Sequence, residues 1–349
     1  MKRVVTFGEL MLRLKSPGHE RLFQSPLLEA SFGGGEANVA VSLSILGASA
    51  AFVGALSKDA VGEAALRCLR SYGVDVSFVK RAPERTGIYF LETGADQRAS
   101  QVVYDRSGSA ASSMTAGDFD WPDVFADADW FHVTGITPAL SRSAAEAAIE
   151  AASAAKTAGA KVSVDLNYRK KLWNYGAKAP EVMGRLAELA DVLIANEEDL
   201  QLGLGIAPKE GGGSPRLDPS RGGVGAEAYR PLAEAARERY PNLGVVAVTL
   251  RESRSADRNG WSAVLLGRSG YIASRAYALE DIVDRVGGGD SFAAGLIFGL
   301  LEYGNEAKAL EFAVAASALK HTIPGDFNLA TRAEIEALVA GDGSGRVSR

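Results

Sequence analysis

Residues 284–295 read DRVGGGDSFAAG, a run of three glycines that ends at an aspartate and leads directly into apolar residues. Glycines weaken any helix or strand interior, because they lose the most conformational freedom on folding. The apolar run predicts that a helix begins near Gly289 or Asp290. The N–H groups of a helix start attract an anion, and Gly287, Gly288 and Gly289 would let its charge approach the backbone closely. The segment therefore predicts a cradle for phosphate.

Asp290 would lie beside the charge that such a cradle holds. A carboxylate does not stabilise an anion, so its useful role there is as a general base that takes a proton from an attacking hydroxyl. The alternative is that Asp290 only caps a helix after a flexible turn. The glycine run alone is compatible with both interpretations.

A second stretch, GGGEANVAVSLSILG at residues 33–47, repeats the pattern of glycines that lead into a helix. Gly34 and Gly35 precede the helix, and the polar Asn38 lies in its first turn. Two glycine-led helix starts in one chain indicate two ligands that face each other. Ordinary loop chemistry is the alternative to this interpretation.

Short β-branched runs alternate with alanine-rich helical runs along most of the chain, which predicts βαβ units and a mostly parallel sheet. Ligands of such sheets bind beyond the carboxyl ends of the strands. The predicted strands of this sheet lie at 3–8, 50–56, 129–135, 161–167, 190–196 and 244–250, and the predicted helices at 36–47, 59–73 and 143–159.

Three segments depart from the alternation. Residues 86–92 and 100–105 are strand-like with no helix between them, so we expect an antiparallel hairpin outside the main sheet. Residues 204–224 are rich in glycine and proline and indicate a long surface loop. The tail at 341–349 is expected to be disordered.

Composition limits the possible functions. The chain has 349 residues, 47% of them hydrophobic, and a net charge of -5, which argues against a general nucleic-acid binder. Cys68 is the only cysteine, so no disulfide forms within the chain. The start is too polar for a signal peptide and no apolar run approaches 18 residues, so we expect a cytoplasmic protein that binds no membrane. His132 lies in an apolar stretch and is expected to pack, so oxygen ligands would hold any metal, as Mg²⁺ requires.

The two glycine-led stretches, GGGEANVAVSLSILG and DRVGGGDSFAAGLI, resemble the two signatures of the ribokinase-like (PfkB) carbohydrate kinases. The resemblance extends over nearly the whole chain, with Ser57 and Arg285 replacing a usual glycine and a usual threonine. It implies a single domain over 1–349, with a ribokinase-like three-layer α/β/α core around a mostly parallel sheet. It also implies a small β-sheet lid from about 10–34 and 86–106.

The resemblance further implies ATP and Mg²⁺ as cofactors, and the chain has no GxxxxGK[ST] motif that would hold phosphates instead. By position in the family, Asp290 is the general base and the backbone of 287–290 is the anion hole. Asn196 and Glu197 in NEED would hold hydrated Mg²⁺, and their alternative is the capped start of a surface helix. Thr249 and Arg251 would contact ATP phosphates together with Gly287 and Gly289.

The acceptor is inferred from two arginines. Tyr104 and Arg106 alternate on a lid strand and therefore share one face, and Arg169 follows a core strand at its carboxyl end. Arginines in such places bind a carboxylate through two hydrogen bonds. A plain hexose would leave two buried guanidiniums unpaired, which is unfavourable. The sequence thus favours a sugar acid, unless Arg106 pairs with Asp105 or Arg169 lies in a solvated basic turn.

The segments GELMLRL, YDR and DLNYR, with Tyr89, resemble the 2-keto-3-deoxygluconate kinases of the same family. This implies phosphorylation of 2-dehydro-3-deoxy-D-gluconate to its 6-phosphate, although Tyr89 could instead only pack in the lid. The residues that would line the sugar-acid site are Gly34, Gly35, Asn38, Tyr89, Tyr104, Arg106, Arg169 and Asp290.

Other acceptors and another class of protein stay open. Fructose, ribose or 5-dehydro-2-deoxygluconate are acceptors within the same family. A non-catalytic sensor of a sugar acid or nucleotide is the alternative of another class, although binding alone needs no base such as Asp290. An apolar lid face could pair with a second lid, so a homo-oligomer, a dimer or larger, is expected.

Overall fold

The computed structural model describes residues 2–196, 198–207 and 225–341. Most of the predicted surface loop at 204–224 and of the predicted disordered tail at 341–349 lies outside these residues, as does Glu197.

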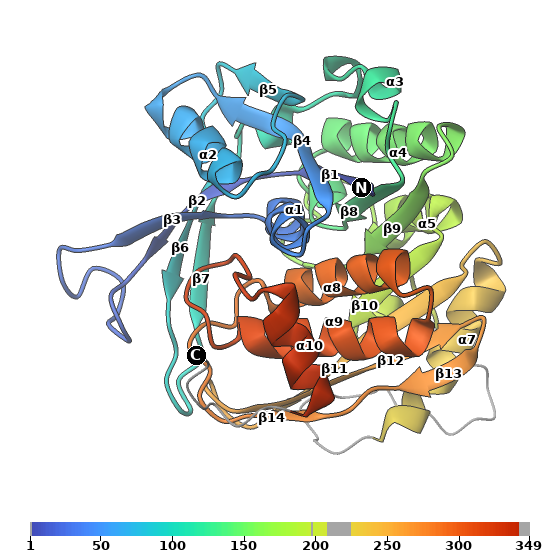
Figure 1. Ribbon diagram of the computed structural model, residues 1–349. Coiled ribbons are helices and arrows are strands. Elements are labelled where there is room, and N and C mark those ends of the chain that lie inside the picture. The colour runs from blue at the N-terminus through green and yellow to red at the C-terminus, as the bar shows by residue number, and fades with distance from the viewer. Residues whose placement is uncertain (1, 197, 208–224, 342–349) are drawn as a thin grey trace.

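A ten-stranded sheet forms the centre of the molecule (Figure 1). Its strand order is β13-β12-β11-β10-β9-β8-β1-β4-β5, with β14 paired to β12. All neighbours from β11 to β5 are parallel, and β12 adds β13 and β14 at an antiparallel edge. The strands are β1 Arg3–Gly8, β4 Ser49–Ser57, β5 Val79–Ala82, β8 Trp130–Thr134, β9 Lys161–Asp165, β10 Val192–Asn196, β11 Val245–Ser253, β12 Asn259–Gly267, β13 Gly270–Ala273 and β14 Tyr277–Leu279. The predicted mostly parallel sheet is confirmed.

Both faces of the sheet are covered by helices and therefore buried. Successive side chains of a strand point to opposite faces, so neighbouring residues belong to different cores. In β1, Val5 and Phe7 pack into one core while Val4 packs into the other. In β10, Leu193 and Ile194 divide in the same way. Two separate hydrophobic cores therefore hold helices against the two faces.

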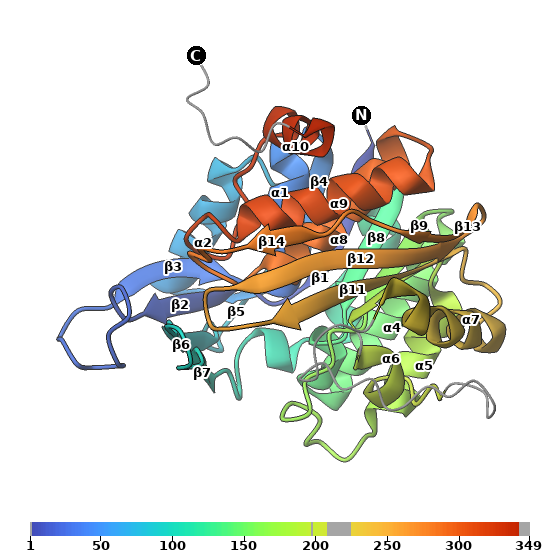
Figure 2. The same ribbon diagram turned by 90° about the horizontal axis from the view of Figure 1, so that it is seen from below.

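The helices form the outer layers, which gives the three-layer α/β/α core (Figures 1 and 2). Those that pack on the core of Val5 are α3 Trp121–Val124, α4 Arg142–Thr157, α5 Ala179–Leu189, α6 Asp199–Leu202 and α7 Arg230–Arg239. Those on the core of Val4 are α1 Gly35–Ile45, α2 Ala60–Ser71, α8 Gly288–Glu302, α9 Glu306–Lys320 and α10 Arg332–Ala340. Short 3₁₀ turns lie at Ala111–Ser113, Ala116–Asp118, Thr137–Ala139 and Ala226–Tyr229.

A second, four-stranded sheet projects from the core on the side where β2 and β3 are labelled in Figure 1. Its order is β3-β2-β6-β7, with β2 and β6 parallel and the two outer pairs antiparallel. The strands are β2 Met11–Lys15, β3 Glu29–Gly33, β6 Ile88–Glu92 and β7 Gln101–Asp105. The predicted hairpin outside the main sheet is confirmed as β6 and β7, and we refer to the four strands as the lid sheet.

Candidate active site

One pocket of about 350 Å³ lies beyond the carboxyl ends of the parallel strands, where the lid sheet meets the core. Every site residue predicted from the sequence lines this pocket, apart from Glu197, which lies outside the described residues. The parallel sheet explains the convergence, because β1, β8, β9, β10 and β11 all end at the same edge.

The two glycine-led helices start opposite each other across the pocket floor. Asn38, in the first turn of α1, donates from Nδ2 to Oδ2 of Asp290 in α8 at 2.6 Å. Asn38 is itself fixed, because its Oδ1 accepts from the N–H of Gly34 at 3.1 Å. A Cβ at Gly34 would lie 1.9 Å from the carbonyl oxygen of Glu9, so only glycine allows this close approach. Both predicted helices are confirmed, and the hydrogen bond from Asn38 to Asp290 joins them. The two ligands that would face each other stay a prediction.

The glycines before Asp290 form a tight start to α8. Gly287 is the N-cap and has φ 81°, a left-handed conformation that favours glycine. A Cβ there would lie 2.0 Å from the carbonyl oxygen of Asp326, and one at Gly288 would lie 2.7 Å from His321. The helical ladder begins when the N–H of Ser291 donates to Gly287 at 2.9 Å. The N–H groups of the first turn precede that bond, as an anion-binding helix start requires.

Asp290 combines burial with a polar partner. Burial raises the pKa of Asp290 to about 7, and the charges of Asp326 and Glu36 act in the same direction. The hydrogen bond from Asn38 opposes the shift. A carboxyl group with such a pKa exchanges a proton readily near neutral pH, which suits a general base.

The two arginines of the predicted acceptor site, Arg106 and Arg169, differ in burial and in pairing, and neither is both buried and unpaired. Arg106 is buried, but it forms an ion pair with Glu9, which also accepts from Ser109 at 2.8 Å. Arg169 is exposed and donates to the carbonyl oxygen of Tyr168 at 3.0 Å. The expectation of two buried, unpaired guanidiniums is therefore wrong. What remains is one positive side chain at the rim and one paired guanidinium whose buried Nε has no hydrogen-bond partner within the described protein.

The alternative named for Arg106, an ion pair with Asp105, is not observed. Asp105 lies on the outside of the lid sheet and pairs with Arg85 at 2.5 Å. The guanidinium of Arg106 instead turns inward, 5.4 Å from the ring of Tyr104. Tyr104 is half exposed, and both residues line the pocket.

Tyr89 forms part of the pocket wall, yet its hydroxyl is already engaged. It donates to Oδ1 of Asp326 at 2.5 Å, and its ring lies 6.0 Å from that of Tyr104. Burial, with the charge of Asp326, raises the pKa of Tyr89 well above its ordinary value, so it acts as a neutral donor. Packing within the lid and contact with a ligand are compatible at this position.

The residues predicted to contact ATP line the pocket from β10 and β11. Thr249 donates to the carbonyl oxygen of Ala195 at 3.4 Å, and Arg251 lies over the ring of Trp261 at 5.5 Å. Oδ1 of Asn196 accepts from the N–H groups of Glu198 and Asp199, at 2.8 and 3.0 Å. This is the capping geometry named as the alternative for Asn196, and it occupies the oxygen that a metal would need.

Two further carboxyl groups line the same side of the pocket. Burial and the charges of Asp199 and Asp290 raise the pKa of Asp165 well above its ordinary value. Asp199 is also buried, and its two oxygens accept from the N–H groups of Tyr168 and Asn196, each at 3.0 Å. No cluster of three or more histidine, cysteine, aspartate or glutamate side chains within the described ranges is arranged to bind a metal directly. Carboxyl oxygens are nevertheless the ligand type that Mg²⁺ prefers, and these could hold it through water.

Comparison with known proteins agrees with this geometry. The model of the pfkB family carbohydrate kinases matches residues 1–211 and 262–330. The chain belongs to this family. It is therefore a carbohydrate kinase, and the predicted ribokinase-like fold is confirmed.

Several relatives cover the kinase almost completely. A 2-dehydro-3-deoxygalactonokinase of Haloferax volcanii is 32% identical, with 98% of each chain covered. A 2-dehydro-3-deoxygluconokinase of Bacillus subtilis is 30% identical, with 96% of this chain and 95% of that protein covered. The crystal structure of 2-dehydro-3-deoxygluconokinase from Thermotoga maritima superposes with a TM-score of 0.90 and 45% identity, over 98% of this chain and 100% of that one.

Several pocket residues of the kinase were not predicted. Glu36 is fully buried and its Oε1 accepts from the hydroxyls of Thr134 and Thr137, at 2.9 and 2.7 Å. Asp165 and Asp199 stand within quoted motifs, so their position after strands was a usable signal. Glu9 directly follows β1 and stands in the quoted GELMLRL, so the same signal applied to it. Glu36 follows no strand, and only the fold brings Thr134 and Thr137 near it.

Within the part of the chain that the structure describes, none of the helices has the length and apolar character needed to cross a bilayer.

Proposed function

We propose that the kinase transfers the γ-phosphoryl group of ATP to 2-dehydro-3-deoxy-D-gluconate and forms the 6-phosphate. The observation that carries the proposal is Asp290, a buried carboxyl with a pKa of about 7 at the start of a glycine-led helix. Phosphoryl transfer mainly needs a base, a positioned acceptor and stabilisation of charge on the phosphoryl oxygens. The pocket offers a group for each.

The acceptor hydroxyl would donate its proton to Asp290. Asn38 holds Oδ2, so the proposed base oxygen is Oδ1. The N–H groups of Gly287, Gly289 and Asp290 would face the phosphoryl oxygens as an anion hole, since they precede the first ladder bond of α8. The N–H of Gly288 also precedes that bond, but it donates to the carbonyl oxygen of Arg285 at 3.4 Å. Proton acceptance and charge stabilisation then act from one helix turn.

We propose ATP and Mg²⁺ as the cofactors. Thr249 and Arg251 would contact the ATP phosphates, and the cation would be held through water near Asn196, Glu197 and Asp199. Bound there, Mg²⁺ would neutralise charge on the phosphates.

The sugar-acid assignment rests on Arg169 and Arg106 and on the names of the relatives. Arg169 is the cation best placed to meet a carboxylate that enters from the rim. Arg106 could donate from its unpartnered Nε, although Glu9 already balances its charge. The galacto epimer, 2-dehydro-3-deoxygalactonate, is the second candidate, because the Haloferax volcanii relative bears that name.

Acceptor choice can be tested with ATP, Mg²⁺ and a panel of both epimeric sugar acids, 5-dehydro-2-deoxygluconate, fructose and ribose. We expect kcat/KM for a 2-dehydro-3-deoxy sugar acid to exceed that for fructose by about tenfold or more. Arg169→Gln should lower kcat/KM for the acids by about 10- to 100-fold, since a charged hydrogen bond contributes about 1.5–3 kcal/mol. Lys170→Gln, a neighbouring exposed position, is the matched control.

Each other result of the panel has a meaning. Preference for fructose or ribose would contradict the sugar-acid assignment but keep the kinase chemistry. Binding of sugar acid or ATP without turnover of any acceptor would favour the sensor alternative.

The pH profile of kcat/KM should report the proposed base. Only the deprotonated form of Asp290 can accept a proton, and its pKa in the free enzyme is about 7. We therefore expect kcat/KM to fall by about tenfold per pH unit below neutral pH and to level off above it. A profile that stays flat down to about pH 5 would contradict the assignment of Asp290.

We further propose a homo-oligomer that forms through the lid sheet. Val103 of β7 is 51% exposed and points away from the pocket that Val102 and Tyr104 line, so a second lid could cover this apolar side chain. Light scattering that gives a monomer at micromolar concentration would contradict this proposal.

The cytoplasmic location stays a prediction from the sequence.

A further inference from the structure

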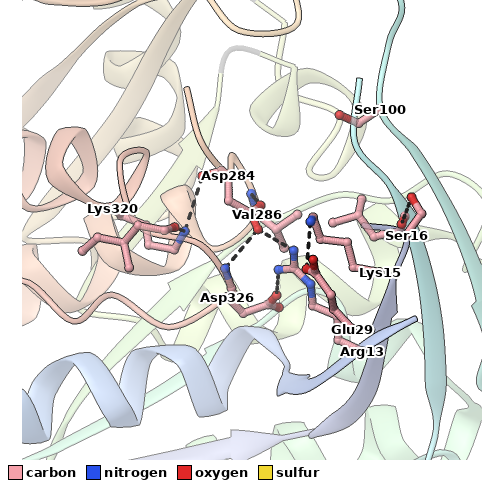
Figure 3. Close-up of polar contacts among 12 residues, drawn as sticks. Arg13, Lys15, Ser16, Glu29, Ser100, Asp284, Val286, Lys320 and Asp326 are labelled. Carbon is pink, nitrogen blue, oxygen red and sulfur yellow. Dashed lines mark hydrogen bonds and ion pairs between the residues drawn. The ribbon is translucent and has the colours of Figure 1, made fainter. Parts of the chain in front are cut away.

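A lysine ammonium lies buried behind the glycine cradle. Lys320 is the last residue of α9, and its side chain has no exposed surface. Its Nζ donates to the carbonyl oxygens of Ile323 at 3.0 Å and of Asp284 at 3.4 Å. Figure 3 shows the side chain directed toward Asp284. Within the described residues, no carboxylate oxygen lies within 4.0 Å of this ammonium.

The two carbonyls belong to the two loops that enclose the cradle. Asp284 lies in the loop between β14 and α8, and Ile323 lies in the loop that follows α9. The loops also meet directly, because the N–H of Gly325 donates to Asp284 at 3.1 Å. At Gly287, a Cβ would lie 2.0 Å from the carbonyl oxygen of Asp326 and 3.3 Å from Cε of Lys320. The conformation of the cradle thus depends on how these loops are held.

Burying an ammonium costs free energy. A lysine at such a position therefore needs a role that an apolar side chain cannot fill. Burial lowers the pKa of Lys320, and the charges of Asp284 and Asp326 oppose this effect. An apolar side chain of similar length would fill the same volume without the desolvation penalty. It could not hold two carbonyls from different loops together, because it has no donor.

We propose that Lys320 is a positioning residue for phosphoryl transfer, whose ammonium cross-links the loop of the phosphate cradle to the loop that follows α9. The inference rests on the proposed role of Gly287–Asp290 as the anion hole. It does not depend on which acceptor the kinase uses.

The test compares Lys320→Met with Lys308→Met, the same change at an exposed position of the same helix. Activity is measured with the acceptor of the panel that the wild type uses best. We expect Lys320→Met to lower kcat by about 30-fold or more and to change the acceptor KM by less than about threefold, because displaced N–H groups stabilise the transition state less. Lys308→Met should behave as the wild type.

Two further measurements separate positioning from a general effect on folding. Hydrogen exchange, which needs no acceptor and no turnover, should become faster at residues 284–290 and 321–326 of Lys320→Met and stay unchanged in the sheet. In Lys320→Ala, added methylammonium should restore kcat by about fivefold or more, because a small ammonium can reach the same carbonyls. Tetramethylammonium, which has no N–H donor, should not restore it.

Every outcome decides the proposal. A kcat within about threefold of the wild type, or a loss that methylammonium does not reverse, would overturn it. If Lys320→Met and Lys320→Ala both fail to fold even with methylammonium present, Lys320 supports the whole domain and the proposal is wrong. If the wild type phosphorylates no acceptor, the proposed function fails, while the exchange measurement still shows whether Lys320 orders the cradle.

Discussion

Asp290→Asn should lower kcat by about 10²- to 10⁴-fold, the usual contribution of a general base. The amide keeps nearly the shape of the carboxyl group, so the first turn of α8 should keep its geometry. Asn cannot accept the proton of the acceptor hydroxyl, because an amide oxygen is a very weak base. Steady-state turnover with ATP, Mg²⁺ and the best acceptor measures the effect, and calorimetric titration with a non-hydrolysable ATP analogue checks that nucleotide binding persists.

The stability of Asp290→Asn as a function of pH shows whether the variant folds normally. Burial raises the pKa of Asp290 from 3.8 to about 7, so the folded state binds a proton more tightly than the unfolded chain in this range. Stability contributed by this group is therefore present at low pH and falls as pH rises toward 7. Asp290→Asn has no charge to bury, so we expect it to gain stability over the wild type by up to about 1.4 kcal/mol per pH unit across this window.

Asp281→Asn is the matched control, since it makes the same chemical change at an exposed position a few residues upstream. It should retain both turnover and the pH dependence of stability. Near-normal turnover of Asp290→Asn would show that another group takes the proton. A loss of turnover together with lower stability at pH 8 would show that the substitution damages the fold.

The sequence was informative about the pocket floor because local signals specify it. The glycines that precede Asn38 and Asp290 indicate helix starts from the local sequence alone. A parallel sheet brings the carboxyl ends of its strands to one edge. These two rules place the described predicted residues in one pocket without knowledge of any long-range contact. The lid hairpin was predictable for a similar reason, since two strand-like runs with no helix between them must pair locally.

The pairing of charges could not be predicted, because it depends on contacts between distant segments. Arg106 meets Glu9, 97 residues away, rather than the adjacent Asp105. Asp105 ends β7 and pairs with Arg85, whereas Arg106 turns toward Glu9, so the two adjacent side chains do not pair with each other. The same limit applies to Arg13, whose hydrophobic surroundings in GELMLRL give no sign of its partners.

Arg13 of β2 joins the lid sheet to the core through two buried ion pairs (Figure 3). Its guanidinium is 1% exposed, pairs with Asp284, and donates to Oδ1 of Asp326 at 2.5 Å. Burial acts to lower the pKa of Arg13, but the charges around it, that of Asp326 above all, raise it overall. One side chain therefore balances two carboxylates that also hold the cradle loops.

Arg13→Met should lower the free energy of unfolding by about 3–5 kcal/mol, the usual effect of removing one partner of a buried ion pair. The methionine fills part of the space, so most of the loss comes from carboxylates left without a cation rather than from a cavity. Urea unfolding monitored by tryptophan fluorescence measures the change. Arg254→Met is the control, because Arg254 forms exposed pairs with Glu252 at 3.4 Å and Glu280 at 3.8 Å, and losing them should matter by about 1 kcal/mol or less.

The triple variant Arg13→Met, Asp284→Asn, Asp326→Asn separates charge from shape. If unpaired carboxylates cause the loss, replacing both by amides should restore about half of it, because neither side chain then carries a buried negative charge. Recovery should stay incomplete, because the two carboxylates also offset the charge of the buried Lys320 ammonium. If the triple variant is as unstable as Arg13→Met alone, packing of the guanidinium between lid and core is the larger effect. If Arg13→Met is no less stable than Arg254→Met, the two buried ion pairs do not hold the lid sheet to the core.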